Sequence, residues 1–349
     1  MKPRALPPQQ LLAAIKHIHA QIRDDVVAAC ARQSVDELSR VSSHVDDEGD
    51  TIFAIDRVSE ERLLQLVDQD IASLAPVVLI AEGLVGGSCV LPSGVREEDA
   101  VYRMIVDPID GTRGLMYQKR SAWILTGVAL NHGQQTNLRD IDVAVQTEIP
   151  VVKQTQSDML WAVRGHKADA ERTDLSTSKR TAVPLRPSRA RDVEHGFSTI
   201  SRFFPGGRDV LAAIDDELAR RLAGGTLKDG DAYCFEDQYI STGGQLYELM
   251  VGHDRFVADL RPLLMQLQRA RGWPAPFCCH PYDLASALIA QEAGVVVTDL
   301  AGEPLNCPLD VASNVGWVGY ANADLRQHIE PVLQSLLRQH GLFATPGVA

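Results

Sequence analysis

The sequence lacks several features that would assign the chain to a class at once. No apolar run reaches the roughly 18 residues of a membrane-spanning helix. The basic start, residues 1–10, is not followed by an apolar segment, so we expect no secretory signal. Six cysteines occur without any C-x-x-C spacing, which argues against a zinc or redox motif. We expect the vicinal Cys278 and Cys279 to be a packing feature in a reduced, cytoplasmic compartment.

Basic residues are also in short supply. The chain has 34 Lys and Arg against 46 Asp and Glu, a formal net charge of −12. Phosphate backbones require basic surfaces, so this excess of acid argues against a nucleic-acid polymer as a partner. The same excess would repel a small anionic substrate unless bound divalent cations reversed the local charge.

Length and apolar content indicate an ordinary globular protein. The chain has 349 residues, of which 45% are hydrophobic, enough for a sizeable core and for about two domains. We expect an N-terminal domain at 1–195 and a C-terminal domain at 196–349.

The most informative stretch is 101–116, VYRMIVDPIDGTRGLM. Its first residues, 101–106, are hydrophobic and β-prone, which predicts a buried strand. Pro108 has no N–H to donate and would end the strand, while Gly111 permits a sharp turn. Asp107 and Asp110 would then lie on a rigid turn, where two carboxylates can converge on a hard cation such as Mg²⁺. An ordinary solvated Asp-Pro turn is the alternative.

A second apolar run delivers another carboxylate in the same way. Residues 77–81 predict a buried strand that ends at Glu82. If this strand lies beside 101–106, Glu82 and Asp107 are presented side by side. The Gly-rich and charged residues 83–100 predict a surface loop or a flap over the site.

The remaining pattern predicts alternating helices and strands, typical of a layered α/β protein. Apolar residues at three- and four-residue spacings predict helices at 11–29, 58–74, 206–225, 238–251 and 325–337. Strands are predicted at 121–131, within 141–165, and at 254–260, 295–298 and 315–320. We expect a polar loop at 42–50, a loop or hairpin at 166–194, and Asp283 as the cap of a helix.

The string DPIDGT at 107–112 resembles the DP(I/L)DGT signature of the inositol monophosphatase-like family of Mg²⁺-dependent phosphatases. The family's second signature, W-D-x-A followed by E-A-G-G, is similar to residues 282–295, with Tyr282 in place of Trp and Val295 in place of the last Gly. Residues 81–83 read A-E-G where the family has G-E-E, so the second glutamate is lost at Gly83. The resemblance implies an α-β-α-β-α sandwich of the inositol monophosphatase and fructose-1,6-bisphosphatase type.

The resemblance also implies roles for the residues that match the motifs. Two or three Mg²⁺ ions would be held by Glu82, Asp107, the carbonyl of Ile109, Asp110 and Asp283. The catalytic residues would be Glu82, Thr112 and Asp56, although Thr51 lies too far upstream for the family's usual spacing to Asp56. Substrate would be bound by Gly111, Thr112, Arg113, Thr242, Gly243 and Gly244, the last three in an altered form of the family's G-(S/T)-A-A segment.

These expectations describe a Mg²⁺-dependent phosphatase for a small phosphate monoester, such as an inositol or sugar monophosphate, that works as a cytoplasmic homodimer. A bisphosphate substrate, fructose 1,6-bisphosphate or 3′-phosphoadenosine 5′-phosphate, is one alternative, with Arg113, Lys119 and Arg120 holding the second phosphate. A non-catalytic binding protein is another, supported by Gly83 and the altered segment 242–244. The segment 261–279 is longer than the family pattern and is expected near the substrate.

Overall fold

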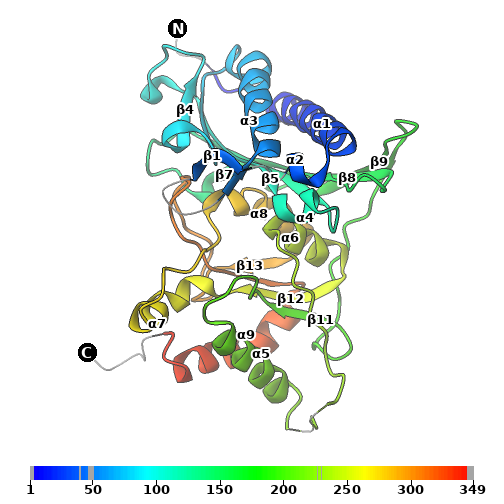
Figure 1. Ribbon diagram of the computed structural model, residues 1–349, viewed down its shortest axis with the longest axis vertical. Helices are drawn as coiled ribbons and strands as arrows, with labels where there is room; N and C mark the ends of the chain where they lie inside the picture. The colour runs from blue at the N-terminus through cyan, green and yellow to red at the C-terminus, as the bar shows by residue number, and fades with distance from the viewer. Residues whose placement is uncertain (1–3, 39–40, 46–50, 226, 229, 344–349) are drawn as a thin grey trace.

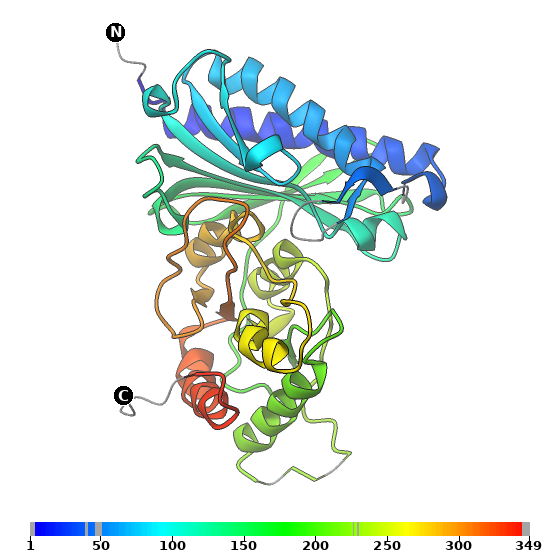
Figure 2. The ribbon, with the colours of Figure 1, turned by 60° about the vertical axis from the view of Figure 1, so that its left-hand side comes forward.

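The computed structural model describes residues 4–38, 41–45, 51–225, 227–228 and 230–343. They form five layers, in which helices and sheets alternate (Figures 1 and 2). The outer helices are α1 (Pro8–Arg32) and α3 (Ala54–Val67) on one side and α5 (Arg208–Leu222) and α9 (Ala323–Gln339) on the other. Between the two sheets lie α6 (Thr242–Val251) and α8 (Ala287–Ala293). The predicted α-β-α-β-α sandwich is confirmed.

The first sheet has the strand order β10-β9-β8-β7-β6-β5-β3-β4. Its strands are β3 (Val77–Ala81), β4 (Ser88–Leu91), β5 (Tyr102–Asp110), β6 (Ala122–Leu130), β7 (Ile141–Ile149), β8 (Gln156–Val163), β9 (Asp169–Asp174) and β10 (Arg180–Ala182). Only β3 and β5 pair in parallel, with Ala81 opposite Val106. Glu82 and Asp107 follow directly, so these two acidic residues leave neighbouring strands at the same edge.

The second sheet has the order β11-β12-β14-β13. Its strands are β11 (Phe197–Ile200), β12 (Asp254–Asp259), β13 (Val296–Thr298) and β14 (Trp317–Tyr320). Smaller elements are the pair β1 (Val41–Val45) and β2 (Thr51–Phe53) and the helices α2 (Val35–Leu38), α4 (Thr112–Met116) and α7 (Met265–Ala270). The predicted domain boundary at 195/196 falls between the two sheets and stays a prediction.

Two apolar cores lie on opposite faces of the first sheet. Met104 and Val106 of β5 belong to the core under α1 and α3, whereas Ile105 belongs to the core between the sheets. Side chains alternate along a strand, so Asp107 follows Ile105 toward the layer of α6 and α8. By the same alternation Glu82 follows Ile80, which also belongs to the inner core. Both carboxylates therefore face the layer between the sheets.

One prediction about β5 is wrong, because the strand continues through Pro108 to Asp110. Pairing with β3 ends at Val106, and pairing with β6 shifts by one residue between Asp107 and Asp110. Pro108 thus lies in a bulge, where no ladder hydrogen bond needs its missing N–H. The bulge turns both aspartates toward the same space.

Three further expectations are corrected. Part of the predicted loop at 42–50 is strand, since 41–45 forms β1 and pairs with β2; residues 46–50 lie outside the described residues. The predicted loop at 83–100 contains the edge strand β4. Asp283 does not cap α8, which begins after Ser286; it lies in the preceding helical turn, Pro281–Leu284. In the part of the chain that the structure describes, no helix combines the length and apolarity needed to cross a membrane.

Candidate active site

A cavity of about 120 Å³ opens where β3 and β5 end. Its lining includes six carboxylates, from Asp56, Glu60, Glu82, Asp107, Asp110 and Asp283. Two guanidinium groups, from Arg113 and Arg261, also line it. Carboxyl groups therefore outnumber guanidinium groups three to one in this small cavity.

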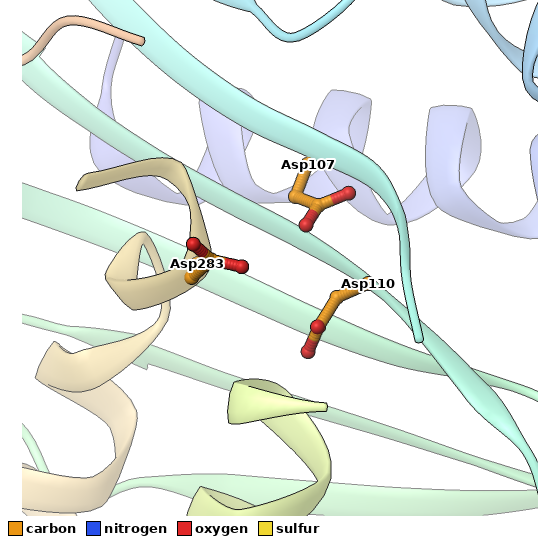
Figure 3. A group of neighbouring side chains, drawn as sticks. All are labelled: Asp107, Asp110 and Asp283. Atoms are coloured by element: carbon orange, nitrogen blue, oxygen red, sulfur yellow. The ribbon is translucent and has the colours of Figure 1, made fainter. Parts of the chain in front are cut away.

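Three of these carboxylates converge. Asp107, Asp110 and Asp283 each offer an oxygen, and the three oxygens lie within 4.8 Å of one another (Figure 3). Burial raises the pKa of Asp107, and the nearby carboxylates of Asp110, Glu82 and Asp283 raise it further. Burial and Asp283 raise the pKa of Asp110 to about 7, and burial raises that of Asp283. Added positive charge favours the ionisation of all three together near neutral pH, and hard oxygen donors suit Mg²⁺, so the donor set fits that ion.

Backbone N–H groups nearby in the chain hold two of the three carboxylates, Asp107 and Asp283, in place. Within the bulge of β5, Asp107 accepts a hydrogen bond from the Ile109 N–H at 3.0 Å. In the turn 281–284, Asp283 accepts one from the His280 N–H at 2.6 Å. In each carboxylate one oxygen accepts this backbone hydrogen bond, which fixes the orientation of the group.

The N-terminus of α6 holds Asp110. Ser241 caps the helix and its hydroxyl donates to Asp110 at 2.7 Å, while the N–H groups of Gly243 and Thr242 donate at 2.6 and 3.3 Å. The Gly244 N–H donates to Ser241 Oγ at 2.8 Å. The predicted substrate-binding glycines thus use their N–H groups within the protein, where they support a carboxylate at the positive end of a helix.

Thr112 and Asp56 come together as the resemblance implies. The Thr112 hydroxyl lies 2.8 Å from the carbonyl oxygen of Ile109 and 3.2 Å from Asp56 Oδ1. Asp56 lies in the first turn of α3, not before the helix. Gly111 has φ +95°, and a Cβ there would meet Ser241 Cβ at 3.1 Å, so glycine permits the close approach of α4 and α6.

Glu60 is a site residue that the sequence did not reveal. A Cβ on Gly83 would lie 1.9 Å from Glu60 Oε1, so the Glu60 carboxylate occupies the space left by the missing side chain. Burial and the Asp56 charge raise the pKa of Glu60 to about 7. The sequence held only part of the signal: Asp56 and Glu60 are four residues apart and share one face of a helix, but the spacing does not say which strand that face meets.

The basic side chains at the cavity also differ from those that the sequence predicted. Arg113 lines the cavity, but Lys119 and Arg120 do not. Arg120 pairs with Asp237 at 2.5 Å. Arg261, the first residue of the segment 261–279, does line the cavity, so that segment lies at the site as expected.

Known structures share this arrangement of elements. Fructose-1,6-bisphosphatase of Leishmania major superposes with a TM-score of 0.64 and 14% identity, over 94% of each chain. The chain has the inositol monophosphatase and fructose-1,6-bisphosphatase fold. The extragenic suppressor protein SuhB of Bartonella henselae (TM-score 0.61, 16% identity, 93% of this chain and 98% of that one) shares the fold. So does a gene product described as an inositol monophosphatase–fructose 1,6-bisphosphatase (TM-score 0.61, 16% identity, 92% and 98%). No protein-family model and no curated protein matches the sequence.

Proposed function

We propose that the chain is a Mg²⁺-dependent phosphatase that hydrolyses a small phosphate monoester by attack of water. The convergence of Asp107, Asp110 and Asp283 within 4.8 Å carries the proposal. These residues come from two distant segments of the chain, and bringing them together costs free energy unless cations are bound. The shared fold supports the choice of reaction, since two of the structures that share it are described as phosphatases of fructose 1,6-bisphosphate or inositol monophosphate.

The proposed ligands of two or three Mg²⁺ ions are Glu82, Asp107, the carbonyl of Ile109, Asp110 and Asp283. Bound Mg²⁺ would lower the pKa of a water and neutralise charge on the phosphate and the leaving oxygen. Glu60, half-buried beside Gly83, would add a carboxylate where the family motif has its second glutamate.

The chain's own residues would orient water and substrate. The Thr112 hydroxyl has one hydrogen, and both Ile109 O and Asp56 Oδ1 lie close enough to accept it. The lone pairs of the hydroxyl oxygen are then left to accept a hydrogen bond from the attacking water. Asp56 and Glu82 are the proposed acceptors of that water's proton. Gly111, Thr112 and Arg113 line the cavity at the start of α4 and would hold the phosphate through N–H and guanidinium groups.

A monoester is favoured over a bisphosphate. Arg113 lines the cavity, whereas the other two cations proposed for a second phosphate, Lys119 and Arg120, do not. Homodimeric assembly is a further proposal that rests on the resemblance alone, and a cytoplasmic location is one that rests on the cysteine spacing. Sedimentation of the purified protein tests the first of them.

Phosphate release from a panel of esters, with and without Mg²⁺, tests the function. The panel holds inositol 1-phosphate, sugar monophosphates, fructose 1,6-bisphosphate and 3′-phosphoadenosine 5′-phosphate. We expect Mg²⁺-dependent release that Asp110→Asn lowers by at least roughly a hundredfold, as for loss of an electrostatic catalytic group. Asp254→Asn is the matched control, because Asp254 is also 6% exposed with a pKa raised to about 7 by burial, but lies outside the cavity. Failure to release phosphate together with failure to bind Mg²⁺ would refute the proposal.

A further inference from the structure

A second and larger cavity, of about 950 Å³, adjoins the acidic one. The two share four lining residues: Arg113, Phe204, Phe277 and Cys278. A phosphate held among the carboxylates and their metal ions would therefore have its ester oxygen near this second space. The second cavity is the natural place for the rest of the substrate.

The lining changes character between the two cavities. Among the described residues, no carboxylate lines the second one, against six in the first. Rings dominate instead, from Phe204, Trp273, Phe277 and His280. Phe204 and Phe277 meet edge to face with centroids 5.2 Å apart, and Phe277 meets His280 in the same way at 6.1 Å. Phe204, Phe277 and His280 thus form a connected set of rings, a ring wall of the kind that receives another ring by stacking or edge contact.

Two polar side chains of the second cavity, Gln268 and His280, are committed to the protein. The buried Gln268 donates through Nε2 to the Gly206 carbonyl at 3.0 Å. His280 Nδ1 lies 3.1 Å from the Ser313 carbonyl oxygen. A polyhydroxylated group placed against Gln268 and His280 would lose hydrogen bonds to water without replacing them at these side chains, whereas an aromatic group would lose none.

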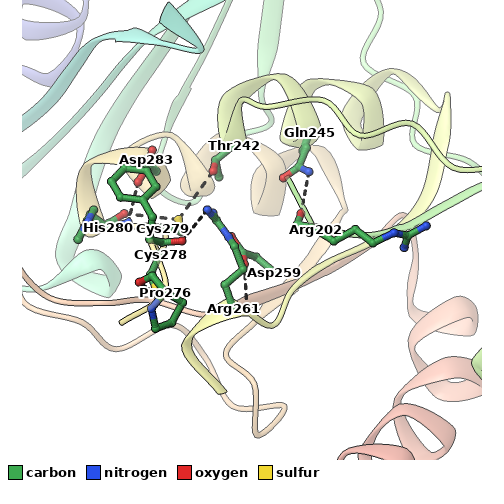
Figure 4. A network of polar contacts seen from close by, with 12 residues as sticks. Arg202, Thr242, Gln245, Asp259, Arg261, Pro276, Cys278, Cys279, His280 and Asp283 are labelled. Atoms are coloured by element: carbon green, nitrogen blue, oxygen red, sulfur yellow. Dashed lines mark hydrogen bonds and ion pairs between the residues drawn. The ribbon is translucent and has the colours of Figure 1, made fainter. Parts of the chain in front are cut away.

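The ring wall is fixed by a buried ion pair. Arg261 donates through Nε to Asp259 at 2.8 Å and through Nη1 to the Phe277 carbonyl at 2.9 Å (Figure 4). Its guanidinium carbon lies 5.2 Å from the ring centre of Phe203 and 5.4 Å from that of Phe204. The pair ties the end of β12 to the ring-bearing segment, so the wall is formed before a ligand arrives.

We infer that the ring-lined cavity is the leaving-group subsite and takes an aromatic or other flat ring carried by the phosphate ester. The inference rests on the proposed function and narrows its substrate class. In the reaction the bond between phosphorus and the ester oxygen breaks, and a water oxygen bonds to phosphorus. The departing oxygen takes a proton, and the ring-bearing alcohol leaves through the second cavity. The segment 261–279 supplies Trp273 and Phe277 and so acquires a role in specificity.

The test compares two primary alkyl esters whose leaving oxygens have similar reactivity, ethyl phosphate and 2-(2-naphthyl)ethyl phosphate. Both are assayed with Mg²⁺, and inositol 1-phosphate is assayed beside them as a polyhydroxylated ester. We expect kcat/KM to be roughly tenfold higher or more for the naphthyl ester than for ethyl phosphate, from ring contact and apolar burial. Trp273→Ala should reduce that preference while leaving ethyl phosphate turnover within about twofold, because Trp273 lines the second cavity and not the acidic one. Phe235→Ala is the matched control, because Phe235 and Trp273 are both 46% exposed but Phe235 lies outside both cavities.

The outcomes separate this inference from the proposed function. Release from every ester with no preference for the naphthyl group would overturn the subsite and leave the phosphatase standing. Release from none, together with failure to bind Mg²⁺, would overturn the phosphatase. Whenever no ester is hydrolysed, the subsite is judged by calorimetric titration with the alcohol 2-(2-naphthyl)ethanol. Binding that Trp273→Ala weakens, and Phe235→Ala does not, supports the subsite; no binding to the wild-type protein overturns it.

Discussion

Gly83 leaves room for a carboxylate that arrives from another element. The Glu60 side chain reaches from α3 into the space where a Cβ at position 83 would sit, 1.9 Å from its oxygen. Glycine at 83 is also required by the backbone, whose φ is +86°. The loss of one acidic residue from the strand end is therefore matched by the gain of another from the helix above it.

This pairing gives the first prediction, for Gly83→Ala. We expect a loss of about 1 kcal/mol in the free energy of unfolding from the positive φ alone, plus weaker Mg²⁺ binding because Glu60 is displaced. Gly94→Ala is the control, since Gly94 has φ +89° and nothing within 4 Å of its missing Cβ. Urea denaturation and Mg²⁺ titration measure the two effects. Equal Mg²⁺ affinity in both variants would contradict the role of Glu60.

Strand-end carboxylates were predictable from the sequence, whereas Glu60 was not. Asp107 and Glu82 each follow a run of apolar residues, so their position at the sheet edge follows from the strand pattern. The four-residue spacing of Asp56 and Glu60 fixes only a common helix face. Which strand that face meets depends on how α3 crosses β3, and local sequence does not encode this.

At the scale of elements, α6 serves the site through its first turn. Ser241 caps the helix by accepting from the Gly244 N–H and at the same time donates to Asp110. One hydroxyl thus joins the stability of a helix to the position of a proposed metal ligand. Such a residue can be distinguished from an ordinary helix cap by measuring both the stability of the protein and its Mg²⁺ binding.

Ser241→Ala should lower both the stability of the protein and its affinity for Mg²⁺. Loss of an N-cap costs about 1 kcal/mol, and loss of the bond to Asp110 should also weaken Mg²⁺ binding. Asn322→Ala makes the comparable change at α9, where the Asn322 side chain accepts from the Leu325 N–H at 2.9 Å, far from the acidic cavity. Thermal unfolding with and without Mg²⁺ distinguishes the variants: Asn322→Ala should keep the full stabilisation by Mg²⁺. If Ser241→Ala keeps it too, the link to Asp110 has no consequence for metal.

Elements with strong periodicity were predicted, and those set by tertiary pairing were not. The helix at 206–225 and the strand at 121–131 match α5 and β6 closely. The edge strand β4 was missed because Ser88–Leu91 is short, flanked by glycine and defined only by its partner β3. The rule that proline ends a central strand failed at Pro108 because a bulge, invisible in the sequence, removes the need for its N–H.

At the scale of the whole molecule, the site exists only when the two halves of the chain pack. Asp283 comes from the layer between the sheets and meets Asp107 and Asp110 at the edge of the first sheet. Nothing in the local pattern at 281–284 predicts this meeting, and the sequence favoured a helix cap there. The family resemblance predicted that Asp283 meets the other two aspartates, because a second signature in the right order carries information about tertiary contact.

The gathered carboxylates make the folded state sensitive to pH and metal together. The folded-state pKa values of Asp107, Asp110 and Asp283 lie above the unfolded value of about 3.9, so their contribution to stability is present at low pH. It is lost as the pH rises through the folded values, about 7 for Asp110. Mg²⁺ binds the ionised carboxylates and should restore that loss. We therefore expect Mg²⁺ to raise Tm little at about pH 5 and much more at about pH 8.

The comparison with and without Mg²⁺ at each pH isolates the site. Asp254 also has a raised pKa, and the buried His19 has its pKa lowered to about 3 by burial, so both change stability with pH. Neither lines the acidic cavity, so their effects cancel in the difference. Asp110→Asn should flatten both the pH dependence of the metal-free protein and the gain from Mg²⁺. A gain that is the same at both pH values would mean that Mg²⁺ binds somewhere other than these carboxylates, because protons would not be competing with it.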